Sequence, residues 1–274
     1  MKDALPVPVL MYHDLADRLD QVPAAHRPYV VSTDAFRGQM RLLKEATLGG
    51  TRLDAVLGPP PASVSRGRIC VITFDDGHES NYTHALPLLQ EVGLRATFFV
   101  TVGRIGQTPY MSWEQINALD SAGMEIGSHS MTHRPPASLT RSELYGEMDD
   151  SKRLLEDRLG RSVVSASSPT GFFNPQMVSV VRDIGYRALC IGRIALWKDP
   201  HDCFRIPRIP VKIQTGQEEF RRMLLGDPML LLMLRGRQVV RNSLKAALGV
   251  EAYLRFRRTL LRLTGSRRPG SRAG

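Results

Sequence analysis

Short apolar runs alternate with segments of helical periodicity along the first 220 residues of the chain. The run 69–74, ICVITF, is apolar at five of its six positions and predicts a strand buried on both faces, as in a parallel sheet. Further strands are expected at 7–12, 95–100, 124–129, 163–168, 186–191 and 204–211. Helices are expected at 32–46, 85–93, 112–123, 139–160 and 174–185.

This alternation predicts an α/β fold with a parallel sheet. Capping boxes mark two of the expected helix starts, Ser112 with Gln115 and Thr140 with Glu143. The number of strands favours a closed or nearly closed barrel over an open doubly wound sheet, although periodicity alone cannot decide between them. No glycine-rich phosphate motif follows an expected strand, so the sequence does not indicate a nucleotide cofactor.

The net positive charge of the chain comes from its C-terminal part, because acidic residues balance the Lys and Arg residues of the first 220 positions. The 274 residues carry a formal charge of +10, and from Arg221 onward there are 13 Lys and Arg but only 2 Asp and Glu. We therefore expect two parts, a catalytic barrel at 1–220 and a basic amphipathic helical extension at 221–274 with a disordered end. A neutral body argues against a nucleic-acid groove within the fold.

Cysteine usage and the N-terminal segment bear on the compartment. Cys70, Cys190 and Cys203 are odd in number and lack CxxC spacing, so neither a disulfide framework nor a cysteine-based zinc site is expected. The first residues lack a secretory signal pattern, and no run of 18 apolar residues occurs. These features predict a cytoplasmic protein.

Polar residues gather where the expected strands end. Asp75 and Asp76 follow one strand, His129 and His133 follow another, and His13 ends the first. Because parallel strands end on one face of a barrel, these side chains are expected to lie together. Two imidazoles spaced i and i+4 plus a carboxylate form a site for one divalent metal ion, with coordination positions left open for catalysis. Alternatively, Asp-Gly is a turn and the histidines lie on the surface.

Two motifs carry a family resemblance. TFDDG at 73–77 and HSMTH at 129–133 resemble motifs of the polysaccharide deacetylases, carbohydrate esterase family 4, and the similarity extends over about 7–211. The resemblance implies a distorted (β/α)7-type barrel that removes N-acetyl groups from amino sugars. It implies that Asp75 is the general base and that Asp76, His129 and His133 hold the metal, zinc or another divalent transition ion.

The sequence also departs from the family pattern. The third motif normally offers an arginine that holds the base, whereas this chain has SSPTG at 167–171, with Thr170 and Gly171 as candidate oxyanion residues. The usual late histidine is missing. A circularly permuted subgroup that resembles the poly-N-acetylglucosamine deacetylases places it at the N-terminus, which implies His13 as general acid. Arg208 is the candidate for the missing guanidinium.

Trp197 has two possible roles, an apolar wall for the acetyl methyl group or ordinary core packing. The basic tail likewise has more than one interpretation. Its arginines and leucines fall on helical stripes, which suits an anionic membrane surface, in keeping with a peripheral protein on the inner face of the membrane. The alternatives are a helical hairpin packed on the barrel or pairing in a dimer.

The leading hypothesis from the sequence is a metal-dependent hydrolase that removes N-acetyl groups from amino sugars of a glycan, glycolipid or lipid-linked sugar. Two alternatives stay open. One is hydrolysis of a small non-sugar amide by the same fold, and the other is a catalytically impaired protein that only binds glycans. No nucleic-acid partner is expected.

Overall fold

A parallel sheet of nine strands carries the fold, in the order β10–β9–β8–β7–β6–β5–β1–β11, with β4 paired to the first half of β5. The computed structural model describes residues 6–23, 26–46, 49–57, 69–171, 173–199 and 201–248. The strands are β1 (Val9–Tyr12), β4 (Gly49–Thr51), β5 (Ile69–Phe74), β6 (Thr97–Val100), β7 (Glu125–Ser128), β8 (Ser165–Ser167), β9 (Ala188–Ile191), β10 (Ile206–Pro207) and β11 (Ile209–Pro210). A separate pair joins β2 (Asp14–Ala16) and β3 (Val30–Ser32).

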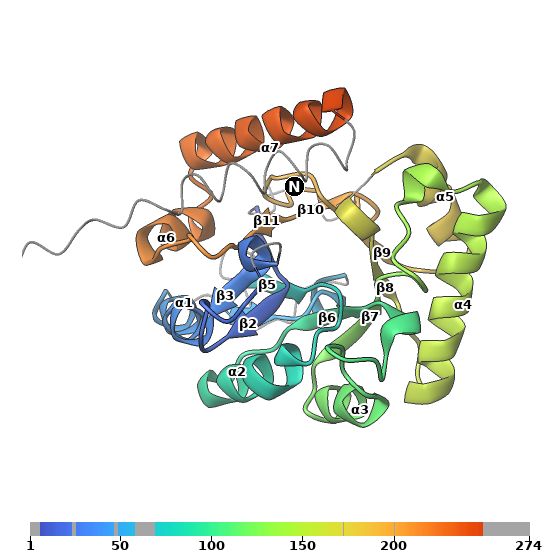
Figure 1. Cartoon of the computed structure of the whole chain (residues 1–274), viewed down its shortest axis with the longest axis horizontal. Helices are drawn as coiled ribbons and strands as arrows, with labels where there is room; N and C mark the ends of the chain where they lie inside the picture. Colours follow the sequence, from blue (N-terminus) through green and yellow to red (C-terminus); the bar gives the residue numbers. More distant parts are fainter. Residues whose placement is uncertain are drawn as a thin grey trace, which may run out of the picture.

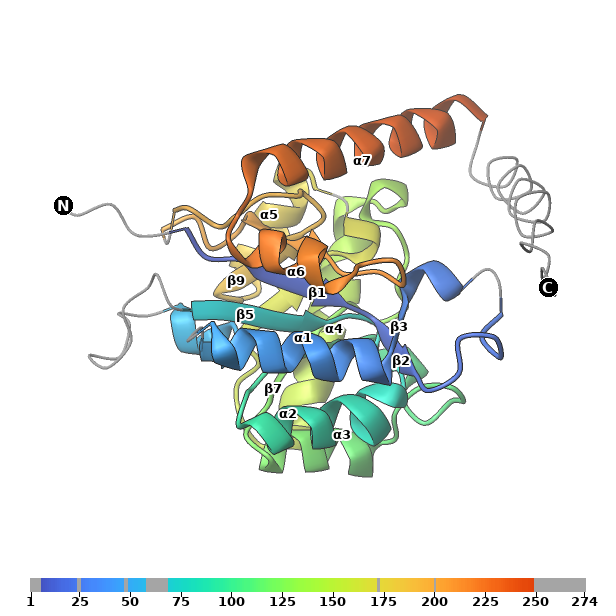
Figure 2. The same ribbon diagram turned by 90° about the vertical axis from the view of Figure 1, so that its left-hand side faces the viewer.

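The sheet closes through a single extended segment. β10 pairs with β9, and β11 pairs with β1 at the other edge of the sheet. Only Arg208 separates β10 from β11, so residues 206–210 join the two edges. The expected distorted (β/α)7-type barrel is therefore confirmed (Figures 1 and 2). Arg208, between β10 and β11, lies at the point of closure.

Helices surround the barrel at the positions that the apolar periodicity predicts (Figure 1). They are α1 (Thr33–Glu45), α2 (Leu86–Val92), α3 (Trp113–Ser121), α4 (Arg141–Leu159) and α5 (Pro175–Asp183). Both predicted capping boxes form, at Ser112 and at Thr140. Each box satisfies backbone N–H groups that have no partner within the helix, which fixes where the helix begins.

Strand alternation divides the buried residues between two cores. On β1 and β5, Leu10 and Phe74 belong to the larger core beneath the helices, whereas Val9 and Val71 belong to a smaller cluster inside the barrel. The inner cluster fills the end at which the strands begin. Farther along β5 the inward positions become polar, so the catalytic chemistry is expected where the strands end.

The C-terminal part contains two helices, α6 (Gln217–Leu224) and α7 (Pro228–Leu248). Phe220 of α6 and Leu231 of α7 are buried in the main core. The boundary expected between residues 220 and 221 thus falls inside α6, a helix that packs on the barrel. The second helix expected in the tail lies outside the described residues. Among the described helices, none combines the length and the apolarity needed to cross a bilayer.

A buried carboxyl group lies inside the barrel, on β7. Glu125 is 2% exposed and accepts hydrogen bonds from the Asp54 N–H, the Thr97 hydroxyl and the Ser165 hydroxyl, at 2.9, 2.7 and 2.5 Å. Burial, and then the negative charge of Asp54, raise the pKa of Glu125. The folded chain therefore retains a proton that the unfolded chain releases near pH 4.3.

We expect Glu125→Gln to remove a pH dependence of stability. Glu125 has a higher pKa in the folded state than in the unfolded state. As pH rises from the unfolded-state pKa to the folded-state pKa, the free energy of unfolding falls by about 1.4 kcal/mol for each pH unit. The amide does not titrate, so the melting temperature of the variant relative to that of the wild type should rise when both are measured at increasing pH between pH 4.5 and pH 8. A difference in melting temperature between the two proteins that stays constant across this pH range would contradict the raised pKa of Glu125.

Candidate active site

The carboxyl end of β5 turns sharply after Asp75. Asp75 donates its backbone N–H to the Tyr12 carbonyl oxygen at 3.0 Å, which ties β5 to the end of β1. Asp76 then takes a left-handed conformation at φ +76°, and Gly77 follows at φ +81°. A Cβ at Gly77 would meet the Val100 side chain at 3.0 Å. The expected Asp-Gly turn is present, and it directs two adjacent carboxylates to different partners.

Asp76, His129 and His133 converge on one point. Asp76 Oδ1 lies 3.4 Å from His129 Nε2 and 3.3 Å from His133 Nε2, and one potential ligand atom from each residue lies within 4.8 Å of the others. His133 reaches this position because the loop, not a helix, carries it, with φ +64° at His133 and φ +66° at Ser130. Burial by itself acts to raise the pKa of Asp76, but the two imidazoles outweigh it and hold the pKa well below its ordinary value.

This donor set fits a divalent metal ion. Asp76 Oδ1 is buried and forms no hydrogen bond within the described part of the chain. The other ring nitrogen of His129, Nδ1, lies 3.0 Å from the Ser167 carbonyl oxygen, which orients the ring with Nε2 toward Asp76. A backbone acceptor behind a ligating histidine is the usual second contact in metal sites. The chain can therefore hold one metal ion here with three protein ligands.

Arg208 holds Asp75 in a two-pronged ion pair. Its Nη1 and Nη2 donate to Asp75 Oδ1 and Oδ2, both at 2.7 Å, and the two side chains are 1% and 4% exposed. Nη2 also donates to the Ser167 hydroxyl at 2.7 Å, and Nη1 to the Thr73 hydroxyl at 3.2 Å. Burial acts to raise the pKa of Asp75, but the charges of Arg208 and His129 outweigh it and lower the pKa. Asp75 is thus an ionised carboxylate facing the cluster.

His13 lies on the neighbouring strand end, directly after β1. Asn81 fixes its backbone by donating to the His13 carbonyl oxygen at 2.7 Å, and the imidazole lies 5.2 Å from the Tyr29 ring, centroid to centroid. Tyr12 pairs with Phe74 in the register of β1 and β5, so His13 and Asp75 leave two neighbouring strand ends side by side. The structure thus brings His13 to the same face as the metal cluster.

The residue after His13, Asp14, adds another carboxyl group near the site. Burial raises the pKa of Asp14 to about 6, and its Oδ1 lies 3.8 Å from His78 Nδ1. Asp14 had no assigned role from its sequence position, because an acid next to a strand end is ordinary turn chemistry.

The SSPTG segment forms a tight loop beside Arg208. Thr170 has φ +60° and is exposed, and Gly171 has φ +71°. A Cβ at Gly171 would meet Gly192 Cα at 2.7 Å, so this close approach of two backbones requires glycine. The Gly171 N–H already donates to the Ser168 carbonyl oxygen at 3.0 Å. Of the two candidate oxyanion residues, Gly171 thus has its N–H engaged, and Thr170 is the better candidate.

Trp197 lies at the opposite end of the barrel from these residues. Its backbone exchanges hydrogen bonds with Val7, just before β1 begins, at 2.8 and 2.9 Å. Its side chain is 5% exposed and belongs to the inner apolar cluster with Val9, Val71 and Phe99. Of the two roles open for Trp197, the structure favours core packing over a wall for an acetyl group, because the indole fills the amino end of the barrel.

Replacing Trp197 by phenylalanine should therefore affect stability and not substrate binding. The smaller ring leaves part of the inner cluster unfilled, so the free energy of unfolding should fall by about 1–2 kcal/mol. The KM for any substrate turned over at the metal cluster should stay within twofold of the wild-type value. A large rise in KM at unchanged stability would show instead that Trp197 contacts the substrate.

Comparisons with known proteins agree with this architecture. A sequence profile of the polysaccharide deacetylase family matches residues 63–189. YxkH of Bacillus subtilis, named for the same family, is 28% identical over 184 residues, which are 66% of this chain and 62% of YxkH. Peptidoglycan-N-acetylglucosamine deacetylase of Bacillus cereus is 29% identical over 139 residues, which are 49% of this chain and 60% of that protein.

The fold matches solved structures more completely than the sequence matches its relatives. The deacetylase PplD of Streptococcus pyogenes, solved in complex with acetate, aligns at a TM-score of 0.70 and 20% identity, over 81% of this chain and 99% of PplD. The chain spans only 62% and 60% of the lengths of the two curated relatives named above. Assignment to the circularly permuted subgroup stays a prediction.

Proposed function

The chain belongs to the polysaccharide deacetylase family, and from this premise we propose that it hydrolyses the N-acetyl groups of amino sugars in a glycan, glycolipid or lipid-linked sugar. One observation carries the proposal. An ionised carboxylate, Asp75, is locked by Arg208 beside a three-residue donor set for a metal ion. This arrangement suits attack by water on an unreactive amide carbonyl.

Asp76, His129 and His133 would hold the metal ion. When bound, such an ion acts as a Lewis acid on the carbonyl and makes water acidic enough to attack it at neutral pH. Two imidazoles and one carboxylate are ligands that zinc accepts readily, so we favour zinc among divalent transition metals.

The residues around this donor set divide the proton transfers. As water adds to the carbonyl carbon, Asp75 accepts its proton, and the guanidinium of Arg208 keeps Asp75 ionised and correctly oriented. The Thr170 N–H is the proposed donor to the carbonyl oxygen, whose negative charge grows in the transition state. His13 donates a proton to the nitrogen as the C–N bond breaks, so that acetate and a free amine leave.

The placement of Arg208 also argues against a protein that only binds glycans. The missing arginine of the third motif was the reason to consider that alternative. A guanidinium from the β10–β11 connection lies against Asp75, with Ser167 of SSPTG as its acceptor. A buried, charge-paired carboxylate next to a metal donor set is what catalysis needs, and simple sugar binding does not require it.

Product analysis tests the proposed reaction. Protein loaded with zinc should release acetate from an N-acetylglucosamine oligomer and generate an equal amount of free amine, detected by mass spectrometry. A small acetanilide-type amide serves as the alternative substrate, and a fully deacetylated oligomer serves as the blank. Turnover of the small amide without turnover of any amino sugar would reject the proposed substrate class.

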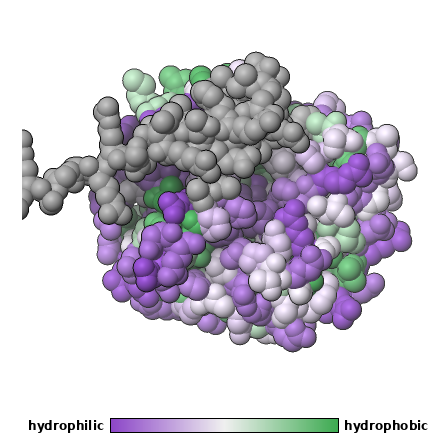
Figure 3. Space-filling view, in the orientation of Figure 1, coloured by the Kyte–Doolittle hydropathy of each residue, from purple (hydrophilic) through white to green (hydrophobic). Residues whose placement is uncertain are grey.

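We further propose that an anionic membrane surface is a partner through α7. The outward side of this helix exposes apolar side chains, namely Met229 (71% exposed), Leu232 (62%), Val239 (63%) and Val240 (60%). Hydrophobic residues gather over α7 in the space-filling view (Figure 3). The helix sequence contains four Lys and Arg and no acidic residue. Apolar area combined with positive charge suits binding to anionic lipid. Such a surface could present a lipid-linked amino sugar.

Changing Leu232 and Val239 together to serine should weaken binding to vesicles that contain anionic lipid by at least tenfold. Each exposed side chain loses on the order of 1.5 kcal/mol of apolar transfer free energy. Tyr145, 39% exposed on α4, provides the matched control, since Tyr145→Ser changes an exposed apolar residue outside α7. Vesicle co-sedimentation that is equal for the wild type and the double variant would exclude α7 as the contact.

A further inference from the structure

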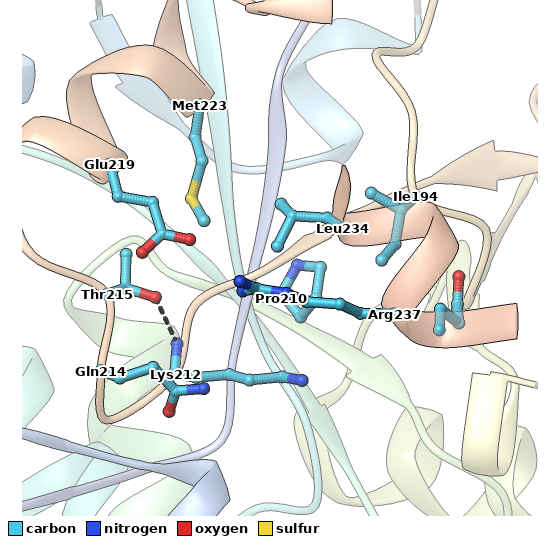
Figure 4. Close-up of a pocket in the computed structure, with 10 residues that line it drawn as sticks. Ile194, Pro210, Lys212, Gln214, Thr215, Glu219, Met223, Leu234 and Arg237 are labelled. Atoms are coloured by element: carbon cyan, nitrogen blue, oxygen red, sulfur yellow. Dashed lines mark hydrogen bonds between the residues drawn. The ribbon is translucent and has the colours of Figure 1, made fainter. Parts of the chain in front are cut away.

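A small cavity of about 50 Å³ lies between β11, α6 and α7 (Figure 4). Polar and charged side chains share its wall with apolar ones, and the polar and charged set includes Lys212, Thr215, Glu219, Arg237 and Gln238. The apolar part comes from Pro210 and Leu234, among others. The metal donor set and the proton-transfer residues do not line this cavity, so it is distinct from the site described above.

The cationic side chains give the cavity a preference for anions. Arg237 extends from α7 and Lys212 from the segment after β11 toward the same space (Figure 4). Arg237 forms no hydrogen bond or ion pair with any residue that the structure describes. Glu219 is the single carboxylate of the lining, against two cations. A guanidinium with free donors beside an ammonium group is a typical receptor for phosphate.

Two structural connections place the cavity next to the catalytic residues. Met11 pairs with Pro210 in parallel register, and the Val211 N–H donates to the Met11 carbonyl oxygen at 2.9 Å. Lys212 is the next residue of this strand end, on the side of the sheet where His13 follows β1. On the other side, Gln238 donates to the Gly192 carbonyl oxygen at 2.7 Å, and the Gly192 N–H donates to Gly171 at 2.9 Å. The cavity thus adjoins both the His13 strand end and the Thr170–Gly171 loop.

We propose that this cavity binds a phosphate group of the substrate. Its volume accommodates about four water molecules, similar to the five heavy atoms of a phosphate group. The inference rests on the proposed function and narrows its substrate class to an N-acetylated amino sugar that carries a phosphate or diphosphate. Such a group occurs in soluble nucleotide sugars and in lipid-linked sugars, which share the chemistry that Arg237 and Lys212 recognise.

Kinetics on matched substrates test the proposal. Acetate release is compared for a neutral N-acetylglucosamine oligomer, a nucleoside diphosphate N-acetylglucosamine and a polyprenyl diphosphate N-acetylglucosamine in detergent. Wild-type protein should prefer at least one phosphate-bearing substrate, and the preferred one identifies the source of the phosphate. Arg237→Ala should raise the KM for that substrate roughly tenfold, the effect of losing one charge-assisted hydrogen bond. Its effect on the neutral oligomer should stay below twofold.

Two further variants distinguish phosphate binding in the cavity from non-specific attraction by the positive charge of the protein surface. Glu219→Gln removes the carboxylate of the cavity and should lower the KM for the phosphate-bearing substrate. Arg221→Ala removes an exposed positive charge of α6 that does not line the cavity, and should leave that KM unchanged. Equal effects of Arg237→Ala and Arg221→Ala, or equal effects on neutral and phosphate-bearing substrates, would overturn the proposal.

Direct binding distinguishes failure of this inference from failure of the proposed function. Calorimetric titration with inorganic phosphate needs no turnover, and binding should weaken in Arg237→Ala but not in Arg221→Ala. If no substrate releases acetate but phosphate binds in this Arg237-dependent way, the phosphate site stands and the deacetylase assignment fails. If acetate is released and phosphate binding is absent or independent of Arg237, the phosphate site is rejected.

Discussion

Arg208→Ala should lower the free energy of unfolding by about 3–5 kcal/mol and reduce turnover at least a hundredfold. Arg208 is 1% exposed, and both of its terminal nitrogens contact Asp75 at 2.7 Å. Without the guanidinium, Asp75 becomes a buried charge with no counterion, which is the costly half of a broken ion pair. The carboxylate would regain a proton more readily and lose its fixed orientation, so it would serve less well as a base. Urea unfolding and acetate release measure the two effects.

A double variant separates the ion pair from general loss of packing. Asp75→Asn combined with Arg208→Met removes both charges and retains most of the side-chain volume, so much of the lost stability should return while turnover stays low. If the double variant loses as much free energy of unfolding as the two single variants lose together, the 2.7 Å contacts between Arg208 and Asp75 are not the source of the stability. If Arg208→Ala retains full stability and turnover, the assigned role of Arg208 fails.

Asp75→Asn should reduce turnover by about 10²–10⁴-fold while metal content stays unchanged. An amide cannot accept the proton that the attacking water loses, whereas Asp76, His129 and His133 still provide the donor set. The variant also leaves the buried Arg208 without its counterion, which destabilises the fold. Activity is therefore measured well below the melting temperature of the variant. Metal content by elemental analysis and steady-state acetate release measure the two quantities.

The matched control is Asp17→Asn, which changes a surface carboxylate that pairs with His84 at 3.5 Å. It should leave turnover unchanged. Turnover by Asp75→Asn that equals the wild-type rate would assign the base to another residue. A parallel loss of bound metal would place Asp75 among the ligands.

The sequence predicted that these polar residues gather on one face of the barrel, because that grouping depends on where strands end. His13, Asp75 and His129 each follow an apolar run, and parallel strands in a barrel end on one side. The capping residues fixed the helix starts at Ser112 and Thr140 for a similarly local reason. Local signals of this kind can be read without knowing the tertiary structure.

Contacts between distant strands were harder to predict. Arg208 was a candidate for the missing guanidinium but could not be assigned from the sequence, because its contact with Asp75 depends on how residues 206–210 close the barrel. Ser167, which accepts from Arg208, was not singled out at all. The only available signal was the pair of serines where the family pattern has an arginine.

The place of buried apolar side chains was hard to predict for a related reason. A lone tryptophan such as Trp197 can pack in the core or line a site, and the sequence does not show at which end of the barrel the indole lies. The boundary at 220 followed the change in charge, whereas Phe220 and Leu231 pack α6 and α7 onto the barrel core. Charge composition reports on the surface of a helix and says nothing about its buried side.

Metal removal and restoration test the central claim most directly, that metal-assisted hydrolysis of an N-acetyl amino sugar occurs at Asp76, His129 and His133. Acetate release from the N-acetylglucosamine oligomer or its phosphate-bearing form is followed after exhaustive chelation and then during titration with zinc. We predict that turnover disappears on chelation and returns in proportion to added zinc, reaching its plateau at one ion per chain. Undiminished turnover by the metal-free protein would contradict this mechanism.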